Sequence, residues 1–167
     1  MSILKNSNFV GRYNIAKNLY INATVDELIE RLEITYLNRV LGVELAKILM
    51  DDIATVQPVD PDLLELFQPF SMQDQCTHEI YESLGVVEML KGFLYYEIIK
   101  DRKEVPALTG GNVEPDNENS TKILGDKMFD FYNEAVRSAR AIQYKCIMEL
   151  EKYPSFKGVK INYVSKF

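Results

Sequence analysis

The most hydrophobic stretch of the chain runs from Glu79 to Lys100, and its large apolar residues point in nearly every direction around a helix. These residues are Val86, Val87, Met89, Leu90, Phe93, Leu94, Tyr95, Ile98 and Ile99. A helix that is apolar on all sides is buried in a larger core. Gly85 and Gly92 fall on one side of it, two turns apart, where the missing side chains let another backbone come close. The pattern predicts a central buried helix.

A second helical pattern precedes this stretch and begins at Thr24, which is a good N-cap because Asp26 and Glu27 follow it in the first turn. Its apolar residues recur every three or four positions, with an interruption at Gly42. We therefore expect a kink or a short break there. The residues on this stripe are Val25, Leu28, Ile29, Leu32, Tyr36, Val40, Val43, Leu45, Ala46, Leu49 and Ile53.

A short helix is predicted from Asp60 to Phe67, because Asp60 is an N-cap residue and Pro61 suits the first helical position. Pro69 ends it. The polar residues from Ser71 to His78 then lead into the central helix, with Ser71 or Thr77 as alternative caps.

A long last helix is predicted from a cap at Ser120 or Thr121 to a stop at Pro154. At about 1.5 Å per residue, roughly 30 residues span about 45 Å. Its apolar stripe is Leu124, Met128, Phe131, Ala135, Ala139, Ile142, Cys146 and Leu150. For the core of the domain we select Phe93, Leu94, Phe131, Ile142 and Leu150.

Three segments have no lasting helical period. We predict that residues 1–23 form an extended arm and that residues 101–121, which are rich in Gly, Pro and Asn, form a long loop. We predict that residues 154–167 form a tail that contains a strand. The strand would pair with the arm or with another subunit. The anchors of the arm are Phe9, Val10, Tyr13, Ile15 and Tyr20. The prediction is an all-α helical bundle over 24–153, with a loop between the last two helices, an N-terminal arm and a short C-terminal β-strand.

Charge is distributed unevenly along the chain, whose net charge is −6. Residues 1–23 carry three basic residues and no acid, and residues 151–167 carry four lysines against one glutamate, so each end is +3 and the middle is −12. Basic ends on an acidic body suit arms that lie on their own domain or on a neighbouring copy, although solvated tails are an equal alternative. The loop at 101–121 is −3 and is a plausible acceptor for a basic end.

The two cysteines, Cys76 and Cys146, lack a C-x-x-C spacing and are expected to be free thiols in a reducing compartment. The chain has no secretory leader pattern and no apolar run long enough to span a bilayer, so we expect neither secretion by that route nor membrane insertion.

Candidate chemistry is sparse. The only mixed cluster is Cys76, His78, Glu79 and Glu82, and it lacks the two or three histidine or cysteine ligands that a metal site normally uses. We therefore expect no metal, no cofactor and no catalytic residue, and classify the chain as a non-enzyme. The sequence also contains no P-loop, G-x-S-x-G or H-E-x-x-H motif.

Two further patterns have a structural and a functional interpretation. Acidic pairs at Asp51–Asp52 and at Asp60 and Asp62 resemble a Mg²⁺ site, but a solvated helix end is the favoured interpretation. The pair Tyr95–Tyr96 resembles a base-stacking platform, but its place in a buried helix favours a core role.

Several stretches resemble the head–tail connector (adaptor) proteins of tailed bacteriophages, and in style the ring proteins of crAss-like phages of gut bacteria. The first stretch is the arm and the first helix, GRYNIAKN and ELIERLEITYLNRVLGVELAKIL. The second is the central helix with the loop that follows it, LKGFLYYEIIKDRKEVPALTGGNVEPDNENS. The third is the end of the last helix, from Tyr144 to Tyr153. The resemblance implies a helical-bundle subunit of a ring, twelve-fold in this family, that lies below the portal protein and continues the DNA channel. It transfers no catalytic residue.

The resemblance also implies the partners and the location: the portal protein, other copies of the chain, the next tail or ring protein, and DNA that passes without sequence-specific binding, in the virion and before assembly in the host cytoplasm. The interface residues that we select are Val105, Leu108, Asn112, Val113, Glu114, Asn117, Phe156, Val159, Lys160, Ile161, Tyr163 and Phe167. The alternatives are a helical protein-binding or regulatory module acting as a monomer or dimer, and a small metal-dependent enzyme that would need His78.

Overall fold

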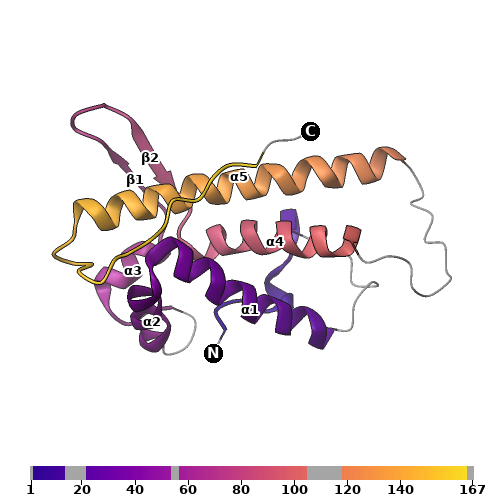
Figure 1. The fold of residues 1–167 in the computed structure, drawn as a ribbon, viewed down its shortest axis with the longest axis horizontal. Coiled ribbons are helices and arrows are strands. Elements are labelled where there is room, and N and C mark those ends of the chain that lie inside the picture. Colours follow the sequence, from indigo (N-terminus) through magenta and orange to yellow (C-terminus); the bar gives the residue numbers. More distant parts are fainter. Residues whose placement is uncertain (1, 14–21, 54–56, 105–117, 165–167) are drawn as a thin grey trace.

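The computed structural model describes residues 2–13, 22–53, 57–104 and 118–164 (Figure 1). These residues form a mostly helical structure with one small antiparallel sheet. The helices are α1 (Asn22–Leu41), α2 (Val43–Asp52), α3 (Pro61–Phe67), α4 (Val86–Glu104) and α5 (Glu118–Met148). Short 3-10 turns lie at Asn6–Asn8 and Gly11–Tyr13, and the strands are β1 (Phe70–Gln73) and β2 (Ile80–Ser83).

The central helix of the fold is α4, which is covered by α5 on one side and by α1 on the other (Figure 1). Phe93 stacks on Tyr36 of α1 with 4.4 Å between ring centroids, and it meets the edge of Tyr132 of α5 at 5.2 Å. A Cβ atom at Gly92 would lie 2.7 Å from the carbonyl oxygen of Phe131. The predicted close approach at Gly92 is therefore confirmed.

The beginning of α4 differs from the prediction, because the helix starts at Val86 and not at Glu79. Residues 80–83 form β2, which pairs with β1 in the register Phe70↔Ser83 to Gln73↔Ile80. Gly85 has φ +85°, a left-handed conformation that separates the strand from the helix. The hairpin was missed because four residues are too short to display a two-residue period within an apolar run.

Two predicted boundaries agree closely with the structure. Gly42, with φ +87°, separates α1 from α2. The carboxylate of Asp60 accepts hydrogen bonds from the backbone N–H groups of Asp62 and Leu63, and Pro61 opens α3. The other helix starts were predicted two to four residues late, because α1 begins at Asn22 and α5 at Glu118.

The C-terminal strand is a wrong prediction: the described part of the tail, residues 155–164, contains no strand. It forms an extended segment along α5, which we call the strap (Figure 1). Lys157 N–H donates to the carbonyl of Leu41 at 3.0 Å, and Val159 N–H donates to that of Arg39 at 2.7 Å. The last carbonyls of a helix have no partner within it. The tail therefore bonds to the end of α1 and not to a sheet edge.

Most of the selected core residues are buried, with two differences. Phe131 is only partly buried, and Leu150 is 52% exposed because α5 ends at Met148, well before Pro154. The chain then turns, and Tyr153 fills the core in its place, its hydroxyl donating to the carbonyl of Asp62 at 2.7 Å.

The N-terminal arm, residues 2–13 in the structure, lies against α1 and α4. Phe9 and Tyr13 are buried as predicted, whereas Val10 is exposed, and Leu4 is a further buried anchor. The predicted anchors Ile15 and Tyr20 lie outside the described residues. Arg12 forms an ion pair with Glu134 of α5 at 3.0 Å. In this part of the chain, a basic end lies on its own acidic domain.

Candidate functional site

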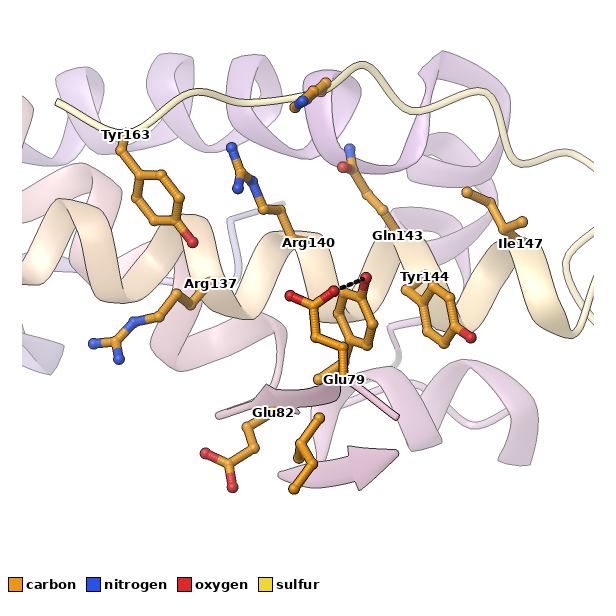
Figure 2. A pocket seen from close by; sticks show the side chains of 11 residues that line it. Glu79, Glu82, Arg137, Arg140, Gln143, Tyr144, Ile147 and Tyr163 are labelled. Atoms are coloured by element: carbon orange, nitrogen blue, oxygen red, sulfur yellow. Dashed lines mark hydrogen bonds between the residues drawn. The ribbon is translucent and has the colours of Figure 1, made fainter. Parts of the chain in front are cut away.

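A groove of about 610 Å³ lies between β2, α5 and the strap (Figure 2). It is the strongest candidate for a functional site because three separate segments contribute to it. It is lined by Glu79, Ile80, Tyr81, Glu82, Arg137, Arg140, Gln143, Tyr144, Ile147, Lys160 and Tyr163.

One face of α5 forms the floor of this groove. Arg137, Arg140, Tyr144 and Ile147 follow one another every three or four residues, so they lie along one face of α5. Tyr81 of β2 stacks on Tyr144 with a centroid distance of 4.2 Å and an interplanar angle of 7°. This stacked pair holds the hairpin against α5, and both rings line the groove.

The cations of the groove differ in how they are held. Arg140 donates to the carbonyl of Ile161 at 3.2 Å, and its guanidinium lies 4.2 Å from the ring centroid of Tyr163. Arg137 and Lys160 form no ion pair with the described residues. Two positive charges are thus left available at the groove.

The acids of the groove lie on the β2 side. Glu79 accepts a hydrogen bond from the Tyr81 hydroxyl at 3.1 Å, and Glu82 is exposed. The hydrogen bond to Glu79 raises the pKa of Tyr81, and partial burial with a hydrogen bond to Asp74 raises the pKa of Tyr144 to about 12. Both phenols stay protonated at neutral pH. The groove therefore offers hydrogen bonds, aromatic faces and positive charge, which suit binding.

A smaller hollow of about 360 Å³ lies between α1 and α2. Its lining is mainly apolar, and Ile34 and Val43 are exposed there. Lys47 is the one charged side chain that lines it. The two hollows share no residue. They are lined by different helices, and α1 lies on the other side of α4 from α5 (Figure 1).

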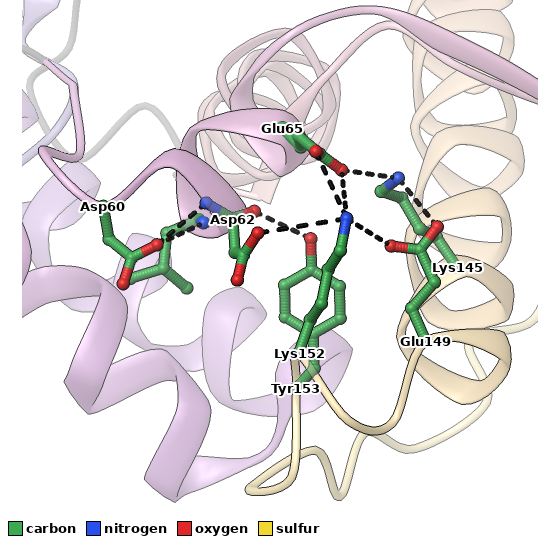
Figure 3. A network of polar contacts seen from close by, with 8 residues as sticks. Asp60, Asp62, Glu65, Lys145, Glu149, Lys152 and Tyr153 are labelled. Carbon is green, nitrogen blue, oxygen red and sulfur yellow. Dashed lines mark hydrogen bonds and ion pairs between the residues drawn. The ribbon is translucent and has the colours of Figure 1, made fainter.

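A network of charges joins the end of α5 to α3, as Figure 3 shows. Lys145 pairs with Glu65 at 2.9 Å and with Glu149 at 3.1 Å, while Lys152 pairs with the same two acids at 3.3 Å and 3.1 Å. The hydrogen bond from Lys145 holds the pKa of Glu65 below its usual range. Every member has an opposite charge beside it, so we assign the network to structure.

The candidate metal-binding residues do not converge. Within the parts of the chain that the structure describes, no group of three or more His, Cys, Asp and Glu side chains could hold a metal ion. Asp52 accepts hydrogen bonds from the N–H groups of Val59 and Asp60, and Asp60 caps α3. Cys76 is exposed near the turn of the hairpin and Cys146 is buried in α5, and both are free thiols.

The interface residues selected from the sequence fall into three groups. Val105, Leu108, Asn112, Val113, Glu114, Asn117 and Phe167 lie outside the described residues. Lys160 and Tyr163 line the groove, Val159 is exposed beside it, and Phe156 packs partly against the core. Ile161 is 2% exposed and is covered by its own chain.

Sequence analysis missed the α5 side of the groove, formed by Arg137, Arg140, Gln143, Tyr144 and Ile147. Their helical spacing was a signal, but only the apolar stripe of the helix was followed. Among the described residues, no helix has both the length and the apolar character needed to cross a membrane. Comparison of the chain with protein-family models, curated proteins and solved structures finds no match.

Proposed function

We propose that this chain is a structural virion protein that forms an oligomeric ring at the head–tail junction of a tailed bacteriophage. In this role it joins the portal protein to the next tail or ring protein and continues the DNA channel. The observation that carries the proposal is that one subunit has two different hollows, the apolar one on α1 and α2 and the charged groove on α5.

Symmetry connects this observation to a ring. In a two-fold dimer both subunits use the same patch, whereas a closed ring is built from contacts in which one patch meets a different one. A chain with two unlike surfaces therefore fits a ring better than a two-fold dimer. The exposed apolar residues Ile34 and Val43 both line the hollow on α1 and α2, where they offer an apolar contact to another subunit.

The charge of the chain supports the same role. A net charge of −6 gives little attraction for the DNA backbone, so a channel built from such subunits lets DNA pass. The resemblance of the sequence to connector proteins supplies the portal as partner and twelve as the expected copy number.

The test is electron microscopy and mass measurement of the purified chain, alone and with the portal protein from the same genome. We expect a ring stacked on the portal. Val43→Asp should abolish it by placing a charge in the apolar hollow. Val59→Asp is the matched control, because Val43 and Val59 are both 67% exposed and Val59 lines neither hollow.

Both variants should keep the circular dichroism of the wild type, because neither residue is in the core. Cutting the chain after Pro154 is a poorer test, since it removes the buried Ile161. A wild-type chain that stays a monomer or dimer beside the portal would contradict the ring and favour the alternative, a helical binding or regulatory module.

A further inference from the structure

The groove on α5 contains positive charge that the described residues do not neutralise. Arg137, Arg140 and Lys160 stand against Glu79 and Glu82, a balance of +1 on a chain whose net charge is −6. The acids lie on the β2 side, and the cations on α5 and the strap. A ligand on the α5 and strap side of the groove therefore meets mainly cations, together with the rings of Tyr144 and Tyr163.

Among the residues outside the described ranges, only the segment 105–117 carries acidic side chains, which are complementary to these cations. Residues 105–117, between the end of α4 and the start of α5, carry Glu114 and Asp116 and no basic residue. The same segment contains Leu108 and Val113, which suit the apolar and aromatic parts of the groove.

The segment of the same chain cannot bring both acids into the groove. Glu114 is four residues and Asp116 two residues before Glu118, the start of α5, so their backbones lie within about 14 Å and 7 Å of it. Along the helix, at about 1.5 Å per residue, Arg137 lies about 28 Å and Arg140 about 33 Å from that start.

Lys160 is equally remote from the start of α5. Arg140 donates to the carbonyl of Ile161 and Gln143 to that of Val159, so Lys160 lies level with these two side chains. If Glu114 and Asp116 both occupy the groove, the distances therefore exclude the same chain as their source.

We infer that the groove binds the acidic segment 105–117 of a second copy of this chain. Glu114 and Asp116 pair there with Arg137 and Lys160. This inference rests on the proposed ring and deepens it, because the contact joins the loop end of one subunit to the hairpin end of the next. Such a head-to-tail contact repeats around a ring.

The first test exchanges the charges and observes assembly on the portal. Arg137→Glu with Lys160→Glu should weaken the contact more than about ten-fold, because like charges then face each other. Glu114→Lys with Asp116→Lys should do the same from the other side. Mixing the two double variants should restore rings, since every groove then has a segment of opposite charge available.

The matched control is Arg31→Glu with Lys127→Glu, which changes the net charge equally at two exposed positions outside the groove. It should assemble like the wild type. If Arg137→Glu with Lys160→Glu assembles normally, or if the mixture does not recover, the inference is wrong and the proposed ring is unaffected.

The second test does not require a ring. A fluorescent peptide of residues 108–120 is titrated with the purified chain, and its anisotropy is measured. It should bind the wild type and lose most of its affinity for the Arg137→Glu, Lys160→Glu variant, as should a peptide with Glu114→Gln and Asp116→Asn. Binding without any ring on the portal would support the inference and contradict the proposed function. No peptide binding would overturn the inference.

Discussion

The two ends of the chain both lie against the helices of the fold, yet they are held by different chemistry. On the arm, the backbone N–H groups of Ile3 and Leu4 donate to the carboxylate of Glu33 at 2.7 and 3.0 Å, and so does the Ser2 hydroxyl at 2.8 Å. Glu33 belongs to α1 and is fully buried. The start of the arm is therefore held by one buried ionisable side chain, whereas Asn6 and Arg12 further along bond to Asp26 and Glu134.

The strap is held by side chains of α5 that do not titrate near neutral pH. Asn133 exchanges two hydrogen bonds with the backbone of Val164, and Gln143 donates to the carbonyls of Val40 and Val159. Arg140 adds the bond to Ile161. The comparison teaches that a buried carboxylate and a row of amide contacts can each hold a terminal segment on the helices, and that of these two sets of contacts only the carboxylate responds to pH.

The largest effect is expected at the arm. Glu33→Ala leaves two backbone N–H groups without an acceptor, and at roughly 1–3 kcal/mol for each buried unsatisfied group we expect a loss of about 3 kcal/mol. Chemical denaturation measures the free energy of unfolding. Glu27→Ala, an exposed residue of the same helix, is the control and should change it little. Equal losses in the two variants would show that Glu33 has no special role.

The next effect is expected at the strap. A Cβ at Gly158 would overlap the carbonyl oxygen of Val40, so Gly158→Ala must push the strap away from α1, at about 2 kcal/mol. Gly11 of the arm is the comparison: it has φ +64°, but a Cβ added there would have no atom within 4 Å, so Gly11→Ala meets only backbone strain of about 1 kcal/mol. A larger loss of unfolding free energy for Gly11→Ala than for Gly158→Ala would contradict the expectation that the close contact at Gly158 costs more than the backbone strain at Gly11.

These two ends also show how far the sequence could predict the structure. Phe9 and Tyr13 were found because large apolar residues in a polar segment must be buried somewhere. Glu33 was missed, since a glutamate in an amphipathic helix is normally exposed and its partners are backbone groups that no side-chain pattern reveals. Long periodic segments gave α4 and α5, but the hairpin did not show because four residues carry too little periodicity.

The groove was predicted only in part, because a pattern within one segment does not show which other segment it will contact. Lys160 and Tyr163 were selected from the alternation of the tail, which does describe an extended segment. That alternation could not show which surface the tail would meet. The carbonyls at the end of α1 are available only because Gly42 ends that helix, and Arg137 enters the site only because the strap then follows α5.

The smallest effect, and the sharpest test of the comparison, is pH. Burial raises the pKa of Glu33 above its ordinary value of 4.5, although its three hydrogen bonds oppose the shift. The folded state then holds this proton more tightly than the unfolded state. The stability contributed by protonated Glu33 is complete below pH 4.5 and is lost as the pH rises through the raised folded-state pKa.

Glu33→Gln cannot ionise, so the difference in unfolding free energy between it and the wild type should change over this interval, by about 1.4 kcal/mol for each pH unit between the two pKa values. Asn133→Asp is the opposite change at the strap, where it adds a titrating group and loses the bond to the Val164 carbonyl. Denaturation of all three proteins from about pH 4 to about pH 8 measures the differences. A constant difference between Glu33→Gln and the wild type would mean that Glu33 keeps its ordinary pKa, so the arm would then be as insensitive to pH as the strap.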